Sequence, residues 1–226
     1  MTTKLQYHLS ELKVVRELRN PKRLVPAFAC SGWSVLDVGC GIGQTLVAAE
    51  LSYCRERHGI DIDAEAIEAG SRMFPELDLR VAPAERIPYP DDTFELTYSR
   101  VALPYSCVPK ALTEIHRVTK PGGFIWLALH PWRMERLNLT EAIRGLRVRR
   151  LLDRFYVLAH SAALNYAGVS FARPWNRTYE SFQTIRGARS LLTRAGFADV
   201  EITDADHFLA VGRKPLAASE SSRAEP

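Results

Sequence analysis

Three alternating glycines, Gly39-Cys40-Gly41-Ile42-Gly43, follow a short apolar run from Ser34 to Val38 that resembles a β-strand. Glycines at such a turn let the backbone bend tightly and approach a ligand without an intervening side chain. Helix-like sequence follows from Ile42 to Arg55, and the first turn of a helix presents free N–H groups. A strand, a glycine-rich turn and a helix in this order predict a ligand-binding turn.

Strand-like and helix-like segments alternate along most of the chain. This alternation predicts a parallel sheet covered by helices on both faces. Ligands of such sheets lie outside the carboxyl ends of the strands, so the residues directly after each strand are the candidates for binding. Further strands are expected over 58–62, 79–82, 94–99, 124–129, 200–203 and 208–212, and helices over 8–19, 64–73, 109–119 and 188–194.

The glycine turn does not fit the fingerprint of dinucleotide-binding proteins. That fingerprint needs glycine at the sixth position counted from Gly39, and Gln44 stands there. Asp37 precedes the turn, and its carboxylate would repel a pyrophosphate but tolerate an ammonium or sulfonium group. The pair of observations disfavours NAD as the ligand.

Acidic residues follow the second and third predicted strands. Asp61 lies at the end of the second predicted strand and can accept hydrogen bonds from both hydroxyls of a ribose. Asp63 is interpreted as the N-cap of the next helix. Glu85 follows the third strand, where an acidic side chain and backbone groups can contact an adenine edge.

Five segments in a fixed order carry a resemblance to a known family: VLDVGCGIG, GIDID, AERIPYPDDTFEL, EIHRVTKPGGFIWL and LLTRAGFADVEI. From Ser34 to Val211 the chain resembles the class I S-adenosylmethionine-dependent methyltransferases, in particular the small-molecule methyltransferases that share the VLDVGCG loop. The resemblance implies a Rossmann-like α/β fold with a seven-stranded sheet whose last strand is antiparallel. It also implies S-adenosylmethionine as cofactor.

The resemblance implies a set of cofactor contacts. Pro83 departs from the family pattern, because many relatives carry Asp or a small polar residue there and proline has no N–H to donate. The NPPY-type motif of enzymes that methylate amino groups of bases or glutamine is also missing. The implied contacts are Asp37, Gly39 and Gly41 for the methionine moiety and loop, Asp61 and Ile62 for the ribose region, Ala84 and Glu85 for adenine, and Ser99 or Arg100 after the fourth strand.

The chain divides into five segments. We expect an N-terminal helical segment over 1–33, the cofactor-binding core over 34–129, a helical lid insertion over 130–187, the C-terminal part of the core over 188–214 and a disordered tail over 215–226. Insertions at this place in the family usually cover the acceptor substrate. The lid is therefore expected to lie over the acceptor.

The predicted lid is rich in arginine and aromatic residues. Residues 130 to 190 carry 11 arginines, no lysine and four acidic residues. Arg147, Arg150 and Arg154 share one helical face, which predicts either a solvated basic face or a docking site for an anionic acceptor, a carrier-bound acceptor or an anionic membrane surface. The aromatic residues predict a core of the lid or a flat pocket for an aromatic or lipid-like acceptor. They are Phe155, Tyr156, Tyr166, Phe171, Trp175, Tyr179 and Phe182.

Methyl transfer from a sulfonium mainly requires alignment of donor and acceptor. A base is needed only where the acceptor must lose a proton. His130 directly follows the fifth strand and is the first candidate, and Tyr105 is the second. A histidine that only packs at the strand end is the alternative.

We therefore expect a methyltransferase that acts on a small-molecule acceptor, anionic or aromatic in character. Methylation of a protein or RNA, and a non-catalytic cofactor-binding protein of the same fold, are the alternatives. Nucleic acid is disfavoured, because the lid lacks lysines and an evident stacking platform.

The cysteine spacing fits no zinc pattern or disulfide framework, so no metal and four reduced thiols are expected. No run of 18 apolar residues and no apolar signal-peptide core occur, and the cytoplasm is the expected location.

Overall fold

The computed structural model describes residues 3–145 and 148–216. Seven strands form one sheet in the order β3-β2-β1-β4-β5-β7-β6. Neighbouring strands from β3 to β5 are parallel, and β7 runs antiparallel to both β5 and β6. The predicted Rossmann-like sheet with an antiparallel last strand is confirmed. The strands are β1 Ser34–Val38, β2 Glu56–Asp61, β3 Asp78–Val81, β4 Phe94–Arg100, β5 Thr119–Leu129, β6 Ala198–Asp204 and β7 Phe208–Arg213.

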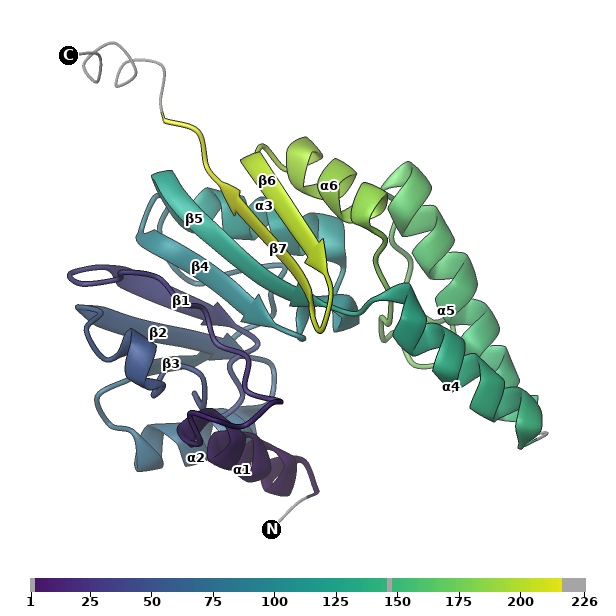
Figure 1. Cartoon of the computed structure of the whole chain (residues 1–226), viewed down its shortest axis with the longest axis horizontal. Helices are drawn as coiled ribbons and strands as arrows, with labels where there is room; N and C mark the ends of the chain where they lie inside the picture. The colour runs from purple at the N-terminus through teal and green to yellow at the C-terminus, as the bar shows by residue number, and fades with distance from the viewer. Residues whose placement is uncertain (1–2, 146–147, 217–226) are drawn as a thin grey trace.

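Helices cover both faces of the sheet, as Figure 1 shows. Helices α1 Thr3–Arg16 and α2 Ala64–Met73 pack on one face, where Leu12 and Ile67 join a buried apolar cluster. Helices α3 Val108–Val118 and α6 Ile185–Arg194 pack on the other. Strand β1, which lies between β2 and β4, is buried along its whole length, including its two polar residues, Ser34 and Asp37.

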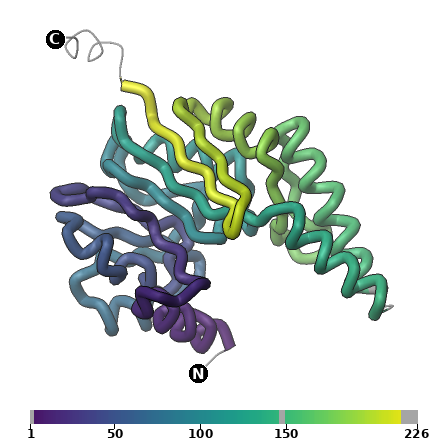
Figure 2. Tube along the Cα trace, in the orientation of Figure 1, coloured from purple at the N-terminus to yellow at the C-terminus, as the bar shows by residue number. Residues whose placement is uncertain are grey.

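The insertion between β5 and α6 contains two helices. Helix α4 Trp132–Arg144 leads away from the sheet, and helix α5 Val148–Ala167 returns beside it (Figures 1 and 2). An irregular segment from 168 to 184 then leads to α6. A helical insertion was predicted here, and its role as a lid stays a prediction. Arg147 lies outside the described residues, as do residues 217–226 of the disordered tail predicted over 215–226.

The predicted helix from Ile42 to Arg55 is wrong. The segment consists of successive turns and one short 3₁₀ helix, η1 Ala49–Leu51. Gly43 has a φ of +81°, which a right-handed helix does not accommodate. Its N–H bonds to the carbonyl oxygen of Cys40, three residues back, at 2.9 Å. The conformation of Gly43, the third glycine of the turn, therefore prevents a regular α-helix from starting at Ile42.

Two cysteines correct the expectation of four reduced thiols. Cys30 and Cys54 form a disulfide, with a Cα–Cα distance of 5.3 Å. It joins the segment that precedes β1 to the segment that precedes β2, and spacing alone did not indicate the pair. Cys40 and Cys107 are free and buried. Among the residues described, no helix is both long and apolar enough to cross a bilayer, and the cytoplasmic location stays a prediction.

Candidate cofactor and acceptor sites

A cavity of about 430 Å³ opens at the carboxyl ends of the central strands. A volume in this range is typical of small-molecule sites. Five of the predicted cofactor contacts and Tyr105 line this cavity. Its lining is Val38, Gly39, Asp61, Ile62, Ala82, Pro83, Ala84, Glu85, Ala102, Leu103, Tyr105, Ser106, Arg177, Thr178 and Tyr179.

Asp61 ends β2 and holds two backbone segments with one carboxylate. Its Oδ2 accepts a hydrogen bond from the N–H of Gly41 at 2.8 Å, and its Oδ1 accepts one from the N–H of Asp63 at 2.9 Å. Each carboxylate oxygen has two acceptor positions, so both oxygens retain one for a ligand hydroxyl. Asp63 caps α2, because its Oδ1 accepts from the N–H groups of Glu65 and Ala66. The prediction that Asp63 is the N-cap of the helix after β2 is confirmed.

The glycine turn is tightly enclosed. Gly39 has a φ of +84°, and a Cβ on this residue would lie 2.1 Å from the Cβ of Ala102. Val101 precedes Ala102 with a φ of +63°, a strained conformation for a β-branched residue, and it directs the chain after β4 across the turn. A Cβ on Gly41 would lie 2.3 Å from Nδ1 of His8, so α1 covers this part of the turn. The close approach of both segments requires glycine.

The far end of the cavity lies after β3. Ala84 and Glu85 line it, and Glu85 Oε1 accepts the backbone N–H of Cys107 at 2.6 Å at the start of α3. This bond fixes the carboxylate beside the cavity. Ile62 is 75% exposed although it is apolar, and it contributes one wall. Tyr179 faces the same space from the insertion.

Four predicted contacts do not line this cavity. Asp37 is buried below the turn, and burial raises the pKa of its carboxyl to about 7, against the opposing effect of Arg100. Ser99 donates its hydroxyl hydrogen bond to the carbonyl oxygen of Val38 at 2.7 Å. Arg100 pairs with Glu11 of α1 at 2.6 Å. Gly41 is also absent from the lining, because His8 covers it. Direct cofactor contacts by these residues stay predictions.

The two catalytic candidates meet. The rings of Tyr105 and His130 pack edge to face, with centroids 5.2 Å apart. Tyr105 lies in the 3₁₀ helix η2 Leu103–Tyr105. This residue is 54% exposed, and partial desolvation of the hydroxyl raises the pKa of that group. His130 follows β5, and burial lowers the pKa of its imidazole, with the Glu180 carboxylate acting in the opposite direction. His130 does not line the 430 Å³ cavity but borders a separate one of about 290 Å³. Tyr105 is therefore the better placed of the two.

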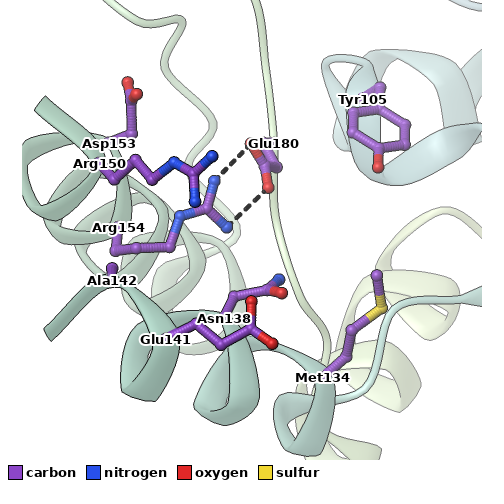
Figure 3. A pocket seen from close by; sticks show the side chains of 9 residues that line it. All are labelled: Tyr105, Met134, Asn138, Glu141, Ala142, Arg150, Asp153, Arg154 and Glu180. Carbon is purple, nitrogen blue, oxygen red and sulfur yellow. Dashed lines mark hydrogen bonds and ion pairs between the residues drawn. The ribbon is translucent and has the colours of Figure 1, made fainter. Parts of the chain in front are cut away.

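Tyr105 also lines a second cavity, of about 390 Å³, within the insertion (Figure 3). This cavity lies between α4, α5 and Glu180, and charged side chains of both signs face it. In Figure 3 the Arg154 guanidinium points toward Glu180, with Tyr105 on the opposite side of the space. The residues around it are Tyr105, Met134, Asn138, Glu141, Ala142, Arg150, Asp153, Arg154 and Glu180.

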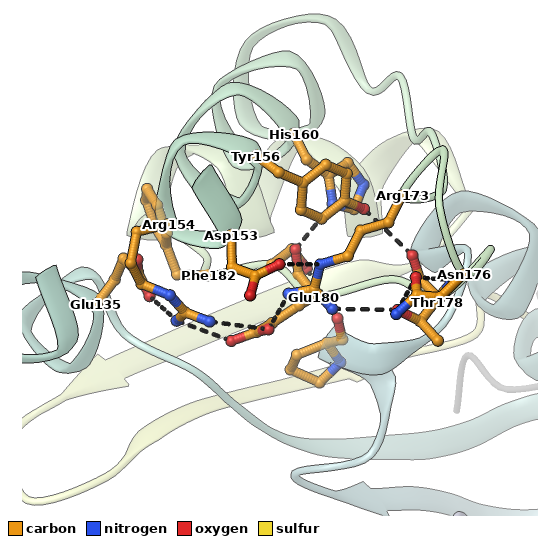
Figure 4. Close-up of polar contacts among 12 residues, drawn as sticks. Glu135, Asp153, Arg154, Tyr156, His160, Arg173, Asn176, Thr178, Glu180 and Phe182 are labelled. Atoms are coloured by element: carbon orange, nitrogen blue, oxygen red, sulfur yellow. Dashed lines mark hydrogen bonds and ion pairs between the residues drawn. The ribbon is translucent and has the colours of Figure 1, made fainter. Parts of the chain in front are cut away.

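The predicted basic face is partly neutralised by acidic partners. Arg154 pairs with Glu135 at 2.9 Å and with Glu180 at 3.0 Å (Figure 4). Arg173 pairs with Glu180 as well and approaches Asp153 at 4.0 Å. Because Arg154 satisfies two carboxylates, one of them only 5% exposed, the idea that it is a free docking cation is wrong. Among the described residues, Arg150 has no ion-pair partner.

The aromatic residues of the insertion divide into two groups. Tyr156 and His160 are buried and pack against each other, and the exposed rings of Phe171 and Trp175 contact Tyr156 from outside. Phe155 and Tyr166 instead point outward. No single flat aromatic pocket forms from the set.

Several lining residues were not predicted. Ala102, Leu103 and Ser106 follow β4, and the rule that ligands lie at the carboxyl ends of strands could have indicated them. Arg177 and Thr178 had no signal, because only the folded insertion brings them to the cavity.

The sheet order, the antiparallel last strand and the cavity at the strand ends define a Rossmann-like cofactor-binding class. Residues 36–127 match the family model described as a methyltransferase domain. Over these residues the chain matches a methyltransferase domain, and its sheet has the Rossmann-like fold of the class I S-adenosylmethionine-dependent methyltransferases.

Relatives and solved structures agree with this assignment. The chain is 35% identical over 129 residues to the uncharacterized methyltransferase YcgJ of Bacillus subtilis, which covers 54% of this chain and 49% of the relative. It is 35% identical over 128 residues to a malonyl-[acyl-carrier protein] O-methyltransferase of Halorhodospira halophila, covering 53% and 43%. Human N-acetylserotonin methyltransferase in complex with S-adenosylmethionine shares the fold with a TM-score of 0.61 and 19% identity, covering 94% and 56%. The chain spans about half the length of the curated relatives it matches.

Proposed function

We propose that this protein transfers the methyl group of S-adenosylmethionine to a small-molecule acceptor. The cofactor would occupy the 430 Å³ cavity, and the acceptor would occupy the 390 Å³ cavity of the insertion. The observation that carries the proposal is the position of Tyr105, which lines both cavities. Donor and acceptor can therefore meet at one side chain.

The residues of the larger cavity fit this cofactor. Asp61 would accept the ribose hydroxyls with the acceptor positions that Gly41 and Asp63 leave free. Ala84 and Glu85 would contact the adenine, and Ile62 would pack against the nucleoside. Gly39 would let the methionine moiety approach the backbone, and the buried Asp37 carboxylate would favour the positive charges of that moiety.

The bound cofactor supplies an electrophilic methyl group. The protein would mainly hold the acceptor in line with it, and such alignment is worth roughly 7–11 kcal/mol. The Tyr105 hydroxyl has a raised pKa and stays protonated at neutral pH, so it would donate a hydrogen bond to the acceptor. His130 has a lowered pKa and is neutral at pH 7, but it lines neither of these two cavities, so we assign it no direct contact with the acceptor.

The charges of the insertion favour a small polar acceptor over a macromolecule. Arg154 and Arg173 are occupied by carboxylates, which leaves little free positive charge for RNA or an acidic protein at this cavity. Both signs of charge around the cavity suit an acceptor that forms hydrogen bonds, rather than an aliphatic chain.

Methyl-labelled S-adenosylmethionine, incubated with the protein and a metabolite extract, tests the proposal. We expect label in one low-mass product identified by mass spectrometry. Label only in protein or RNA would support the macromolecular alternative. Tight cofactor binding without turnover on any extract would support a non-catalytic binding protein.

A further inference from the structure

The outward face of α5 is apolar from Leu152 to Tyr166. Five residues recur there at alternating spacings of three and four, which places them on one side of the helix. Leu152, Phe155 and Tyr166 are 59%, 62% and 80% exposed. The complete stripe is Leu152, Phe155, Ala159, Ala162 and Tyr166, and every member is exposed.

The opposite face of α5 is already used inside the protein. Tyr156, Val157 and Leu164 are buried there. A helix that is apolar on both sides is normally covered on both sides. Contiguous exposed apolar surface of this kind marks an interaction site. We therefore expect the stripe to contact a partner outside the described residues.

Arginines flank both ends of the stripe. Arg149 is exposed, one turn before Leu152. At the other end, the exposed Arg194 of α6 donates a hydrogen bond to the carbonyl oxygen of Ala167 at 2.9 Å. The only acidic residue of α5, Asp153, lies on the other side of the helix, 4.0 Å from Arg173. The apolar stripe thus lies between two positive charges.

This charge pattern discriminates between occupants. A second copy packed antiparallel through α5 would bring Arg149 of one chain near Arg194 of the other. A parallel pair would bring the two copies of Arg149 together. Both arrangements place like charges beside each other at the ends of the stripe, whereas an anionic surface is attracted to both ends.

We propose that the outward face of α5 docks onto an anionic lipid surface. The helix would lie in the plane of the interface, with Leu152, Phe155 and Tyr166 inserted at the headgroup boundary and the arginines at lipid phosphates. Helix α5 also supplies Arg150, Asp153 and Arg154 to the 390 Å³ cavity, so docking would bring that cavity close to the membrane. The docking itself does not depend on methyl transfer.

Flotation of the full chain with lipid vesicles tests the proposal. Vesicles of phosphatidylcholine mixed with phosphatidylglycerol should carry the protein upward, and pure phosphatidylcholine vesicles should bind it at least about tenfold more weakly. Binding should weaken as salt rises, because exposed charges are screened over about 8–10 Å. Absence of binding to the anionic vesicles would overturn the proposal.

Matched variants separate the stripe from general adhesion. The double variant Leu152→Gln, Phe155→Gln should lose at least about tenfold in vesicle binding, since each removed apolar side chain contributes to insertion. Tyr53→Gln, which changes an exposed apolar side chain far from α5 in sequence, should bind as the wild type does. Arg149→Gln should weaken binding, and Arg72→Gln in α2 should not. Circular dichroism would verify that each variant is folded.

The other occupants give different results. Analytical ultracentrifugation of the wild type should show no dimer that the double variant dissociates. Such a dimer would make a second copy the occupant and overturn the lipid proposal. Unchanged vesicle binding by the double variant would overturn it as well.

Discussion

The Asp61 carboxylate accepts the backbone N–H of Gly41 across 2.8 Å, from the end of β2 to the turn after β1. The same carboxylate accepts the N–H of Asp63 at 2.9 Å. One side chain thus fixes the glycine turn and still faces the larger cavity. The conformation of the turn and the affinity for a ligand in that cavity are therefore linked through Asp61.

The turn itself gives a first prediction. Gly39→Ala introduces a Cβ 2.1 Å from that of Ala102 at a φ of +84°, whereas Gly32→Ala meets a φ of +78° in open space. Both variants bear the left-handed cost of about 1–2 kcal/mol, and Gly39→Ala adds overpacking of about 1–3 kcal/mol. Urea unfolding should show this difference, and calorimetry should show impaired cofactor binding for Gly39→Ala only. Equal destabilisation by the two variants would contradict the packing of Ala102 on the turn.

The buried Asp37 predicts a pH dependence of stability. Its folded-state pKa is raised from 3.8 to about 7, so the folded protein retains a proton that the unfolded chain releases above pH 4. The contribution of Asp37 to stability is present below about pH 4 and is lost as the pH rises to 7. One pKa unit corresponds to about 1.4 kcal/mol, so the loss is on the order of 4 kcal/mol.

Asp37→Asn tests this dependence, because asparagine resembles the protonated acid in shape and carries no charge. The variant should be more stable than the wild type at pH 8 and about equal to it at pH 4, as measured by urea unfolding without cofactor. A variant that is less stable at pH 8 would show that the ionised carboxylate is stabilised in the fold.

Substitution of two arginines of α5 should change the stability of the protein by very different amounts. Arg154→Met leaves Glu135, 5% exposed, without its cation, and breaking a buried pair costs about 3–5 kcal/mol. Arg150→Met removes an exposed charge with no ion-pair partner among the described residues, and should change stability by less than about 0.5 kcal/mol. Thermal unfolding compares the two. Similar melting temperatures for both variants would remove the structural role assigned to Arg154.

Removal of the Tyr105 hydroxyl should affect turnover of the acceptor but not binding of the cofactor. Tyr105→Phe keeps the ring packed against His130 and removes only the hydroxyl. The loss of one hydrogen bond, about 0.5–1.5 kcal/mol, should lower kcat/KM for the acceptor about two- to tenfold. The Kd of the cofactor should not change. Tyr53→Phe, an exposed tyrosine outside both cavities, is the control, and equal kinetics for both variants would contradict the role of the hydroxyl.

Most of the sheet could be predicted from the sequence. The strand at 34–38 was predicted at its observed bounds, because a mostly apolar run that ends at a glycine turn is typical of a buried parallel strand. The positions of Asp61 and Glu85 at the cavity could also be predicted, because ligands of a parallel sheet lie at the carboxyl ends of its strands.

The features that failed depend on contacts distant in sequence. The 42–55 segment has helix-like sequence, yet Gly43 adopts a positive φ that a right-handed helix does not accommodate. The helical pattern of α5 placed Arg154 on a basic face, but Glu180 lies 26 residues away and is brought to it only by the folded insertion. The Cys30–Cys54 disulfide likewise depends on the proximity of two loops.

Calorimetric titration of S-adenosylmethionine into Asp61→Asn and Asp63→Asn tests the central claim most directly. An asparagine at 61 has one oxygen for the two N–H groups now held, and offers an N–H₂ group where a ribose hydroxyl needs an acceptor. We expect a loss of about 2–4 kcal/mol, on the order of 30- to 1000-fold in Kd. Asp63→Asn keeps the cap of α2 and should change the Kd by less than about threefold. Equal, small effects at both positions would contradict the assignment of Asp61 to the ribose, and with it the placement of the cofactor in the 430 Å³ cavity.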